Sequence, residues 1–214
     1  MVEFSLWSIF SFLLGAMRWT VLLSLIAFLG GGLVGMGLLM LRFTKLRGMS
    51  TAVAWYVQIF QGTPLLMQLF LVYFGLALLG MDTSPLVSAA ICLTLYASAY
   101  LTEIWRGCVN AIPKGQWEAS TSLALSFTQQ MRYVILPQAG RVAIAPTVGF
   151  LVQIIKGTAL ASVIGFVELT KAGQMISNAT YQPFLAYTFV GLMYFALCYP
   201  LSWWSQRLEK RRLA

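Results

Sequence analysis

Five apolar stretches occupy most of this sequence, and each is long enough to cross the hydrocarbon core of a bilayer, which takes about 20 residues in a helix. They cover approximately residues 17–41, 51–78, 85–109, 139–168 and 183–206. We therefore predict an all-α, polytopic membrane protein with five transmembrane helices, forming a single transmembrane domain over residues 1–214.

The composition excludes several classes of function. Only 9% of residues are charged, against about a quarter in soluble domains. The net charge is +8, but the basic residues lie between the apolar stretches, as in cytoplasmic membrane loops, so we expect a lipid bilayer and no nucleic acid as partner. The chain has no histidine, and its three cysteines form no CxxC pair, so we expect no metal site and no catalytic residues.

The N-terminal segment precedes the first stretch. Residues 4–14 carry Trp7, Phe10 and Leu14 at helical spacing but are too short to cross, so we predict a short interfacial helix. Glu3 is the only charge before the first apolar stretch, which is not typical of a signal peptide. Within the first stretch, Gly31 and Gly35 lie four residues apart and predict close packing against another helix.

The distribution of Lys and Arg predicts the orientation. Basic residues follow the first, third and fifth stretches: Arg42, Lys45, Arg47, Lys114, Arg132, Arg141, Arg207, Lys210, Arg211 and Arg212. The other side holds a balanced set, namely Arg18, Asp82, Glu168 and Lys171. By the positive-inside rule we expect the N-terminus outside and the C-terminus in the cytoplasm.

The polar segment between the third and fourth stretches, about residues 110–138, is longer than neighbouring helices need for a connection. It contains Gly115-Gln116-Trp117-Glu118-Ala119-Ser120, followed by Ala124 and by Leu136-Pro137. A short cytoplasmic helix should open near Gln116. Its faces would carry Trp117, Glu118 and Thr121 on one side and Ala119 and Leu123 on the other. Such a helix either docks into a groove on a partner or lies on the inner leaflet, and the residues alone favour neither.

Polar and helix-breaking residues inside the second, third and fourth stretches are candidates for a substrate pathway. Broken helices at membrane depth are tolerated where the backbone lines a cavity or is covered by protein. Pro146 and Gly165 also interrupt the fourth stretch. The candidates are Gln61, Gly62, Thr63, Pro64, Gln68, Glu103, Gly149, Gln153, Lys156, Gly157 and Thr158. Lys156 could instead pair with Glu103 or extend to the membrane surface, and Glu103 could form a salt bridge with Arg106.

Four motifs carry a resemblance to a known family. No GxxxxGK[ST] phosphate loop is present, so the chain lacks the usual device for ATP hydrolysis. The spacing of Glu118-Ala119-Ser120, Ala124, Val134 and Leu136-Pro137 resembles the cytoplasmic "EAA" loop of ABC importer permeases, in which Ala and Gly usually stand where this chain has Ser120 and Ala124. Residues 60–66, 68–70 and 73–75, residues 99–107 leading into 112–118, and residues 156–160 are similar to the polar amino-acid branch of that family.

The resemblance implies a type I importer in a bacterial inner membrane that carries a polar amino acid. Two permease subunits would join two ATPase subunits, which bind ATP and Mg while this chain binds no cofactor. A periplasmic solute-binding protein would dock on the outer loops, about residues 79–85 and 168–182. The ATPase-coupling residues would be Gly115, Gln116, Trp117, Glu118, Ala119, Ser120, Ala124, Leu136 and Pro137.

The departures from the family pattern bear on the substrate. Relatives that carry basic amino acids have acids aligned with Phe150 and Gly157, and the family's frequent Arg and Asn are replaced by Gln61 and Gly149. We therefore expect a neutral substrate such as glutamine, or an acidic one such as glutamate, and a heterodimer with a sister permease.

Two other classes compete with the importer. An ion-coupled secondary carrier or channel needs coupling-ion sites or filter rings, for which this chain has few intramembrane acids and no evident inverted repeat. A membrane enzyme would have to rely on Glu103, Glu168 or Lys156 without histidine. We expect a transport subunit and not an enzyme.

Overall fold

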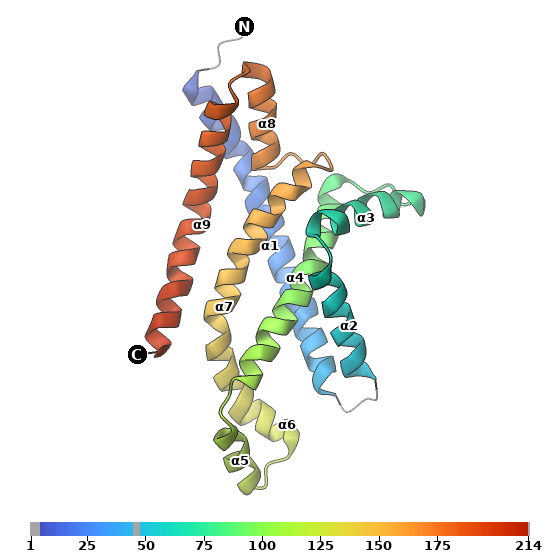
Figure 1. Cartoon of the computed structure of the whole chain (residues 1–214), viewed down its shortest axis with the longest axis vertical. Helices are drawn as coiled ribbons and strands as arrows, with labels where there is room; N and C mark the ends of the chain where they lie inside the picture. Colours follow the sequence, from blue (N-terminus) through green and yellow to red (C-terminus); the bar gives the residue numbers. More distant parts are fainter. Residues whose placement is uncertain (1–4, 45–47, 214) are drawn as a thin grey trace.

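A computed structural model describes residues 5–44 and 48–213, with side chains up to residue 210. Throughout this part of the chain the regular structure is helical (Figure 1). Some residues used to predict the orientation and the N-terminal segment lie outside the described residues: Glu3, Phe4, Lys45 and Arg47, together with the side chains of Arg211 and Arg212.

Four helical segments in the described part are long and apolar enough to cross a membrane, and a bent helix pair makes a fifth span if it is counted as one. The long helices are α1 (Leu6–Phe43), α4 (Pro85–Asn110), α7 (Leu136–Gly157) and α9 (Pro183–Leu213), and the bent pair is α2 (Met49–Gly62) with α3 (Leu65–Leu78). Shorter elements are α5 (Lys114–Ser122), α6 (Phe127–Gln129), the π-helix η1 (Gln130–Ile135), the 3₁₀ helix η2 (Thr158–Ser162) and α8 (Leu169–Thr180). The predicted all-α, five-span architecture is thereby confirmed.

The N-terminal segment is not a separate interfacial helix, and that prediction is wrong. Helix α1 runs without a break for 38 residues, which is about 57 Å at 1.5 Å per residue and well beyond a hydrocarbon core of about 30 Å. Ile9, Leu13 and Ala16 pack against α8 and α9. The first turns therefore have a protein partner that the local sequence did not reveal.

The fourth span also differs from its predicted bounds. One helical run covers residues 127–162, so it begins before residue 139 and ends before residue 168. Pro146 lies inside α7 without ending it, because other groups in a membrane protein can satisfy the backbone carbonyl that a proline leaves free. Residues 169–180, expected as part of an outer loop, form α8 instead.

Close contact between α1 and α4 forms the centre of the fold (Figure 1). A Cβ atom on Gly31 would overlap the side chain of Ala97, and one on Gly35 would lie 2.9 Å from the carbonyl oxygen of Ser98. The predicted close packing at these two glycines is confirmed.

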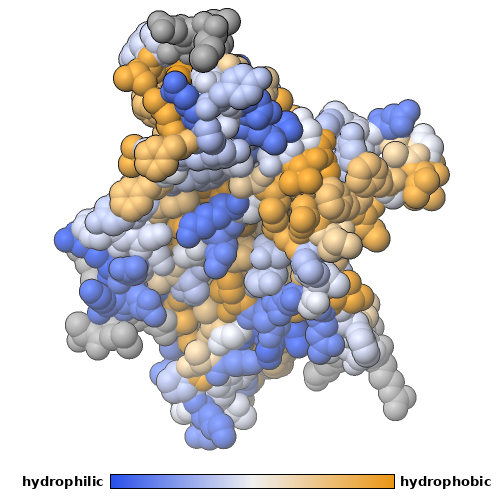
Figure 2. All heavy atoms as spheres, turned by 45° about the horizontal axis from the view of Figure 1, so that its top comes forward, coloured by the Kyte–Doolittle hydropathy of each residue, from blue (hydrophilic) through white to orange (hydrophobic). Residues whose placement is uncertain are grey.

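The two ends of the molecule carry different elements. Helices α5 and α6 lie at one end, and α8 lies at the other, beside the beginning of α1 (Figure 1). Helix α3 extends sideways as an arm, and Figure 2 shows hydrophobic residues covering this arm. The large apolar side chains that it exposes are Met67, Leu71, Phe74 and Leu78.

Candidate coupling surface and translocation pathway

Helix α5 is anchored to the rest of the chain through one face. Trp117 packs against an apolar cluster formed by Val109, Ile112, Met131, Ile135 and Ala139. Ser120 is 2% exposed, and its hydroxyl donates to the carbonyl of Trp117 at 2.8 Å. The prediction that Trp117 shares an outward face with Glu118 is wrong, because the end of α4 and the start of the next span fold beneath α5.

The opposite side of α5 is open to solvent. Its exposed residues are Gln116, Glu118, Ala119, Ser122 and Leu123, and we call this set the coupling surface. Leu123 is 74% exposed and was not among the predicted coupling residues. Its position four residues after Ala119 places both on one helix face, and this spacing could have predicted it. Gly115 is also exposed, at the start of the helix.

The C-terminal end of α5 explains why the family prefers glycine where this chain has Ala124. The φ angle of Ala124 is +53°, which lies in the left-handed region that L-residues rarely adopt. The Ala124 N–H donates to the Thr121 carbonyl at 2.9 Å and the Leu125 N–H to the Ser120 carbonyl at 3.3 Å. This pair of bonds is a Schellman motif, which ends the helix sharply.

Glutamine side chains join α5 to the following span. Gln130 donates to the Thr121 hydroxyl at 3.1 Å and to the Leu125 carbonyl at 2.9 Å. Gln138 donates to the side-chain oxygen of Gln116 at 3.0 Å. Between them lies η1, and single-turn π-helices of this kind are frequent at functional sites. Sequence reasoning did not identify Gln130 or Gln138 as part of this region.

The two family residues at the start of α7 have structural positions. Leu136 packs on the cluster beneath α5. Pro137 occupies the first turn of α7 and is exposed, a place where proline is favoured. These contacts make α5 and the beginning of α7 one connected unit.

The second span breaks where the sequence predicted. The chain bends by 104° between α2 and α3, because Pro64 has no N–H and disfavours helical geometry at Thr63. The amide of Gln68 donates to the carbonyls of Phe60 and Thr63 at 2.8 and 3.0 Å, which satisfies acceptors freed by the break. Its side-chain oxygen is buried and has no partner among the described residues.

Residues 61–64 surround this break and are exposed. Gly62 ends α2, and the Thr63 hydroxyl donates back to the Ile59 carbonyl at 2.7 Å. Exposed polar backbone at this depth is what a pathway or a subunit contact requires.

Glu103 lies in an ion-paired group. It binds Arg106, three residues along the same helix, and also Arg42 of α1 with a distance of 3.1 Å between Oε2 and Nη1. The salt bridge with Arg106 is the alternative that the sequence left open, and Lys156 is not its partner. Arg42, 61 residues away in sequence, was not foreseen.

The remaining candidates on α7 and η2 divide into two groups. Gly149 faces the Ser205 hydroxyl of α9, and Gly157 faces Leu65, so both permit helix contacts. Thr158 is fully buried and donates to the Ile155 carbonyl at 2.7 Å. Gln153 and Lys156 are exposed on α7, and among the α7 and η2 candidates they are the ones placed to meet a ligand.

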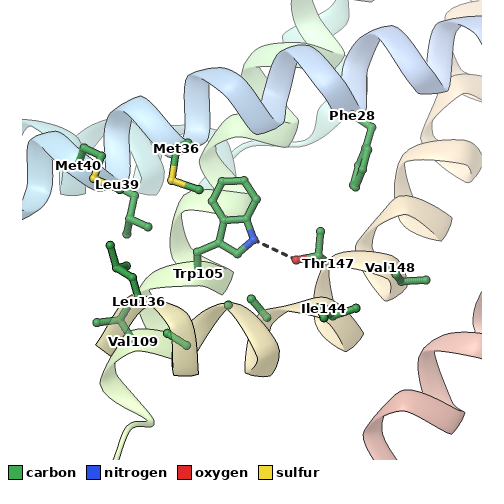
Figure 3. A pocket seen from close by; sticks show the side chains of 13 residues that line it. Phe28, Met36, Leu39, Met40, Trp105, Val109, Leu136, Ile144, Thr147 and Val148 are labelled. Carbon is green, nitrogen blue, oxygen red and sulfur yellow. Dashed lines mark hydrogen bonds between the residues drawn. The ribbon is translucent and has the colours of Figure 1, made fainter. Parts of the chain in front are cut away.

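A cavity of about 550 Å³ lies between α1, α4 and α7, and its lining side chains are drawn in Figure 3. Its walls are apolar side chains such as Met36, Leu39 and Ile144. The polar pair that crosses it, Trp105 and Thr147, is joined by a hydrogen bond of 2.9 Å. A zwitterionic amino acid would lose its hydration there without gaining partners, so this cavity does not suit such a substrate.

At the other end of the molecule, Glu168 is fully buried. Its carboxylate accepts the backbone N–H groups of Thr170 and Lys171 at 2.9 Å each and the Tyr194 hydroxyl at 2.7 Å. Burial raises the pKa of this carboxyl above its ordinary value, against the lowering effect of these donors. Sequence reasoning had placed Glu168 among the outer charges, and nothing local signalled its burial.

Residues 27–213 match the protein family described as "Binding-protein-dependent transport system inner membrane component". The chain belongs to this family. It is similar to "Probable amino-acid ABC transporter permease protein YckA" of Bacillus subtilis (strain 168), with 32% identity over 94% of this chain and 89% of that protein. "Probable glutamine ABC transporter permease protein GlnM" of the same organism is 31% identical, over 94% of both chains.

Solved structures agree with this assignment. The chain is similar to one described as "Crystal structure of an amino acid ABC transporter with histidines", with a TM-score of 0.90, 30% identity and 94% of both chains covered. The fold also matches an inward-facing structure of the MetNI methionine ABC transporter, with a TM-score of 0.78 and 20% identity.

Membership in this family confirms the resemblance read from the motifs. The chain is a multi-pass inner-membrane permease subunit and a transport component, not an enzyme. Its family works with ATPase and binding-protein partners.

Proposed function

We propose that this chain forms part of the translocation pathway of an ATP-driven importer for a polar amino acid. Relatives whose names specify amino acids, glutamine and cystine support this substrate class. The observation that carries the proposal is the coupling surface on α5, which is exposed while its other face is anchored to α4 and the next span.

The mechanism is alternating access driven from outside this chain. ATP and Mg bind to a partner ATPase dimer, whose closure pushes on Glu118, Ala119 and Leu123. Because α5 is joined to α7 through Gln116 and Gln138, the displacement passes to the membrane-spanning helices. The N-terminus lies outside and the C-terminus in the cytoplasm, so α8 faces the solute-binding protein.

A neutral or acidic amino acid suits this chain better than a basic one. Phe150 stacks on Tyr100 with ring centroids 5.4 Å apart. Holding a cationic substrate side chain would require a carboxylate at position 150 instead of this phenylalanine. Lys156 is an exposed cation on a helix of membrane depth, and such ions mark substrate pathways. The buried oxygen of Gln68, which has no partner in the described part of the chain, supplies an acceptor that the substrate ammonium group could reach in another state of the cycle.

The pore is a heterodimer in this proposal. Gln61, Gly149 and Gly157 stand where relatives carry charged or amide side chains, so a sister permease supplies them. Co-purification from native membranes, with identification of every subunit, tests this assembly. Recovery of a complex with this chain as its single type of permease would refute the heterodimer.

The substrate is tested with the reconstituted complex. Binding protein loaded with glutamine or glutamate should stimulate ATP hydrolysis, and binding protein loaded with arginine should not. Stimulation by the arginine-loaded form alone would refute the substrate assignment. Full-rate solute transport in liposomes without nucleotide or partner subunits would refute the importer and favour a secondary carrier.

A further inference from the structure

The buried carboxylate of Glu168 connects three helices at the end of the molecule that bears α8. It caps the first turn of α8 and accepts the hydroxyl of Tyr194 in α9 at 2.7 Å. The hydroxyl of Thr20 in α1 lies 3.5 Å from the carboxylate and accepts the Leu169 N–H at 3.1 Å. Thr20 and Tyr194 are distant from Glu168 in sequence, so these bonds exist only in the folded chain.

Capping α8 does not require this arrangement. A serine, threonine, aspartate or asparagine at a solvent-exposed N-cap satisfies the same backbone groups. Burying a carboxylate is costly unless it is well paired, and no lysine or arginine forms an ion pair with Glu168 in the described part of the chain. The additional bonds to α1 and α9 therefore need a reason beyond ending a helix.

Helix α8 packs closely on the two helices that Glu168 binds. Leu169, Ala172 and Ile176 lie in one apolar cluster with residues of α1 and α9. A Cβ atom on Gly173 would overlap Val190 of α9, so the two backbones approach as closely as glycine permits. The other face of α8 exposes Gln174, Met175 and Asn178.

Both helices continue to the opposite end of the molecule. Helix α1 has 38 residues and α9 has 31. Near its far end, α9 is joined to α7, because Ser205 donates to the Ala145 carbonyl at 2.8 Å. Helix α7 in turn is joined to α5. A displacement of α8 thus has a continuous packed route to the coupling surface.

We propose that Glu168 is a positioning residue, whose bonds to Thr20 and Tyr194 make α8, α1 and α9 move together when the solute-binding protein docks on α8. This inference rests on the proposed function, since it assigns α8 to the docking face of an importer. A packed route alone does not demonstrate coupling, so the test removes the bonds between helices and keeps the cap.

The test uses the complete importer complex in liposomes. Tyr194→Phe removes the bonds of α9 to Glu168 and Thr170. Thr20→Val removes the bonds of α1 to Glu168 and to the Leu169 N–H. In both variants Glu168 still accepts the backbone N–H groups of Thr170 and Lys171. Tyr199→Phe is the matched control, because it removes a hydroxyl from a half-exposed tyrosine of the same helix. Thr20→Ser keeps the hydroxyl and should therefore retain the stimulation of ATP hydrolysis that Thr20→Val loses.

ATP hydrolysis is measured with and without loaded binding protein. We expect Tyr194→Phe and Thr20→Val each to lower the stimulation by about fivefold or more, the lower range of coupling between sites. Basal hydrolysis should match that of Tyr199→Phe. Tyr194→Phe and Thr20→Val should each melt at a lower temperature, because buried polar groups are left without a partner, so both are assayed well below their melting temperatures. Glu168→Gln, which keeps one acceptor oxygen, should show a partial loss.

Two results would overturn the inference. One is unchanged stimulation in both Tyr194→Phe and Thr20→Val. The other is a loss of stimulation that is matched by an equal loss of basal hydrolysis, which would assign the bonds to folding alone. Failure of the proposed function is a separate outcome, because the unmodified complex would then show no stimulation by any loaded binding protein.

Discussion

Replacing Gly31 by alanine should destabilise this permease, whereas the same replacement at Gly37 should stabilise it or leave it unchanged. Both glycines lie in α1, and alanine is favoured over glycine in a helix by about 1 kcal/mol. A Cβ atom on Gly37 meets no atom within 4 Å. A Cβ atom on Gly31 overlaps Ala97 and lies 3.1 Å from backbone atoms of α4, so the two helices have to separate.

The magnitude follows from these contacts. Overpacking of this kind costs about 1–3 kcal/mol, which cancels or exceeds the helix preference at Gly31 and is absent at Gly37. The two variants should therefore differ by about 1–3 kcal/mol in free energy of unfolding. At about 2–4 °C per kcal/mol for a chain of this size, the melting temperatures should differ by several degrees.

Thermal unfolding of the purified complex measures the difference. The double variant Gly31→Ala with Ala97→Gly should recover part of the loss, because it removes the overlapping side chain but not the backbone contacts. Equal melting temperatures for Gly31→Ala and Gly37→Ala would refute the close approach of α1 and α4.

Further expectations concern the coupling surface, the candidate pathway and the end of the molecule that bears α8. Ala124→Gly should stabilise the end of α5 by up to about 1 kcal/mol, because glycine adopts positive φ without strain, and Ala124→Val should destabilise it; amide hydrogen exchange in α5 reports both. Glu118→Lys or Ala119→Trp should abolish coupled uptake while the protein still inserts, and normal uptake at normal expression would count against docking. Lys156→Met should lower uptake about tenfold or more if its charge holds the substrate carboxylate, with Lys156→Arg retaining most activity, as measured with radiolabelled substrate. The raised pKa of Glu168 means that the folded state binds the proton of this carboxyl more strongly than the unfolded state does. The contribution of Glu168 to stability should therefore be largest below the ordinary pKa near 4.5 and fall as pH rises through the folded-state pKa. Melting curves across this range should show the fall in the unmodified chain, and a similar fall in Glu168→Gln would contradict it.

Local chemistry accounts for the features that sequence reasoning predicted well. The break at Thr63-Pro64 follows from the missing N–H of proline, and the pairing of Glu103 with Arg106 follows from a spacing of three residues on one helix. The exposure of Glu118 and Ala119 also agrees with a short cytoplasmic helix. Each of these depends on residues within one or two helical turns.

Contacts between distant segments account for the features it missed. Trp117 and Ser120 face inward because the residues beneath α5 come from α4 and from the beginning of the next span. Gln130 and Gln138 became part of the coupling region only once those segments lay side by side. Arg42 reaches Glu103 from a different helix.

The sequence by itself determined that this chain crosses a membrane several times and carries a long polar loop between its third and fourth spans, because hydropathy and motif spacing are properties of short segments. Tertiary structure alone decided that α1 is continuous and that Glu168 is buried among α1, α8 and α9. The physical reason is that the burial of a side chain depends on which helices surround it, and hydrophobicity along one segment carries no record of its neighbours in space.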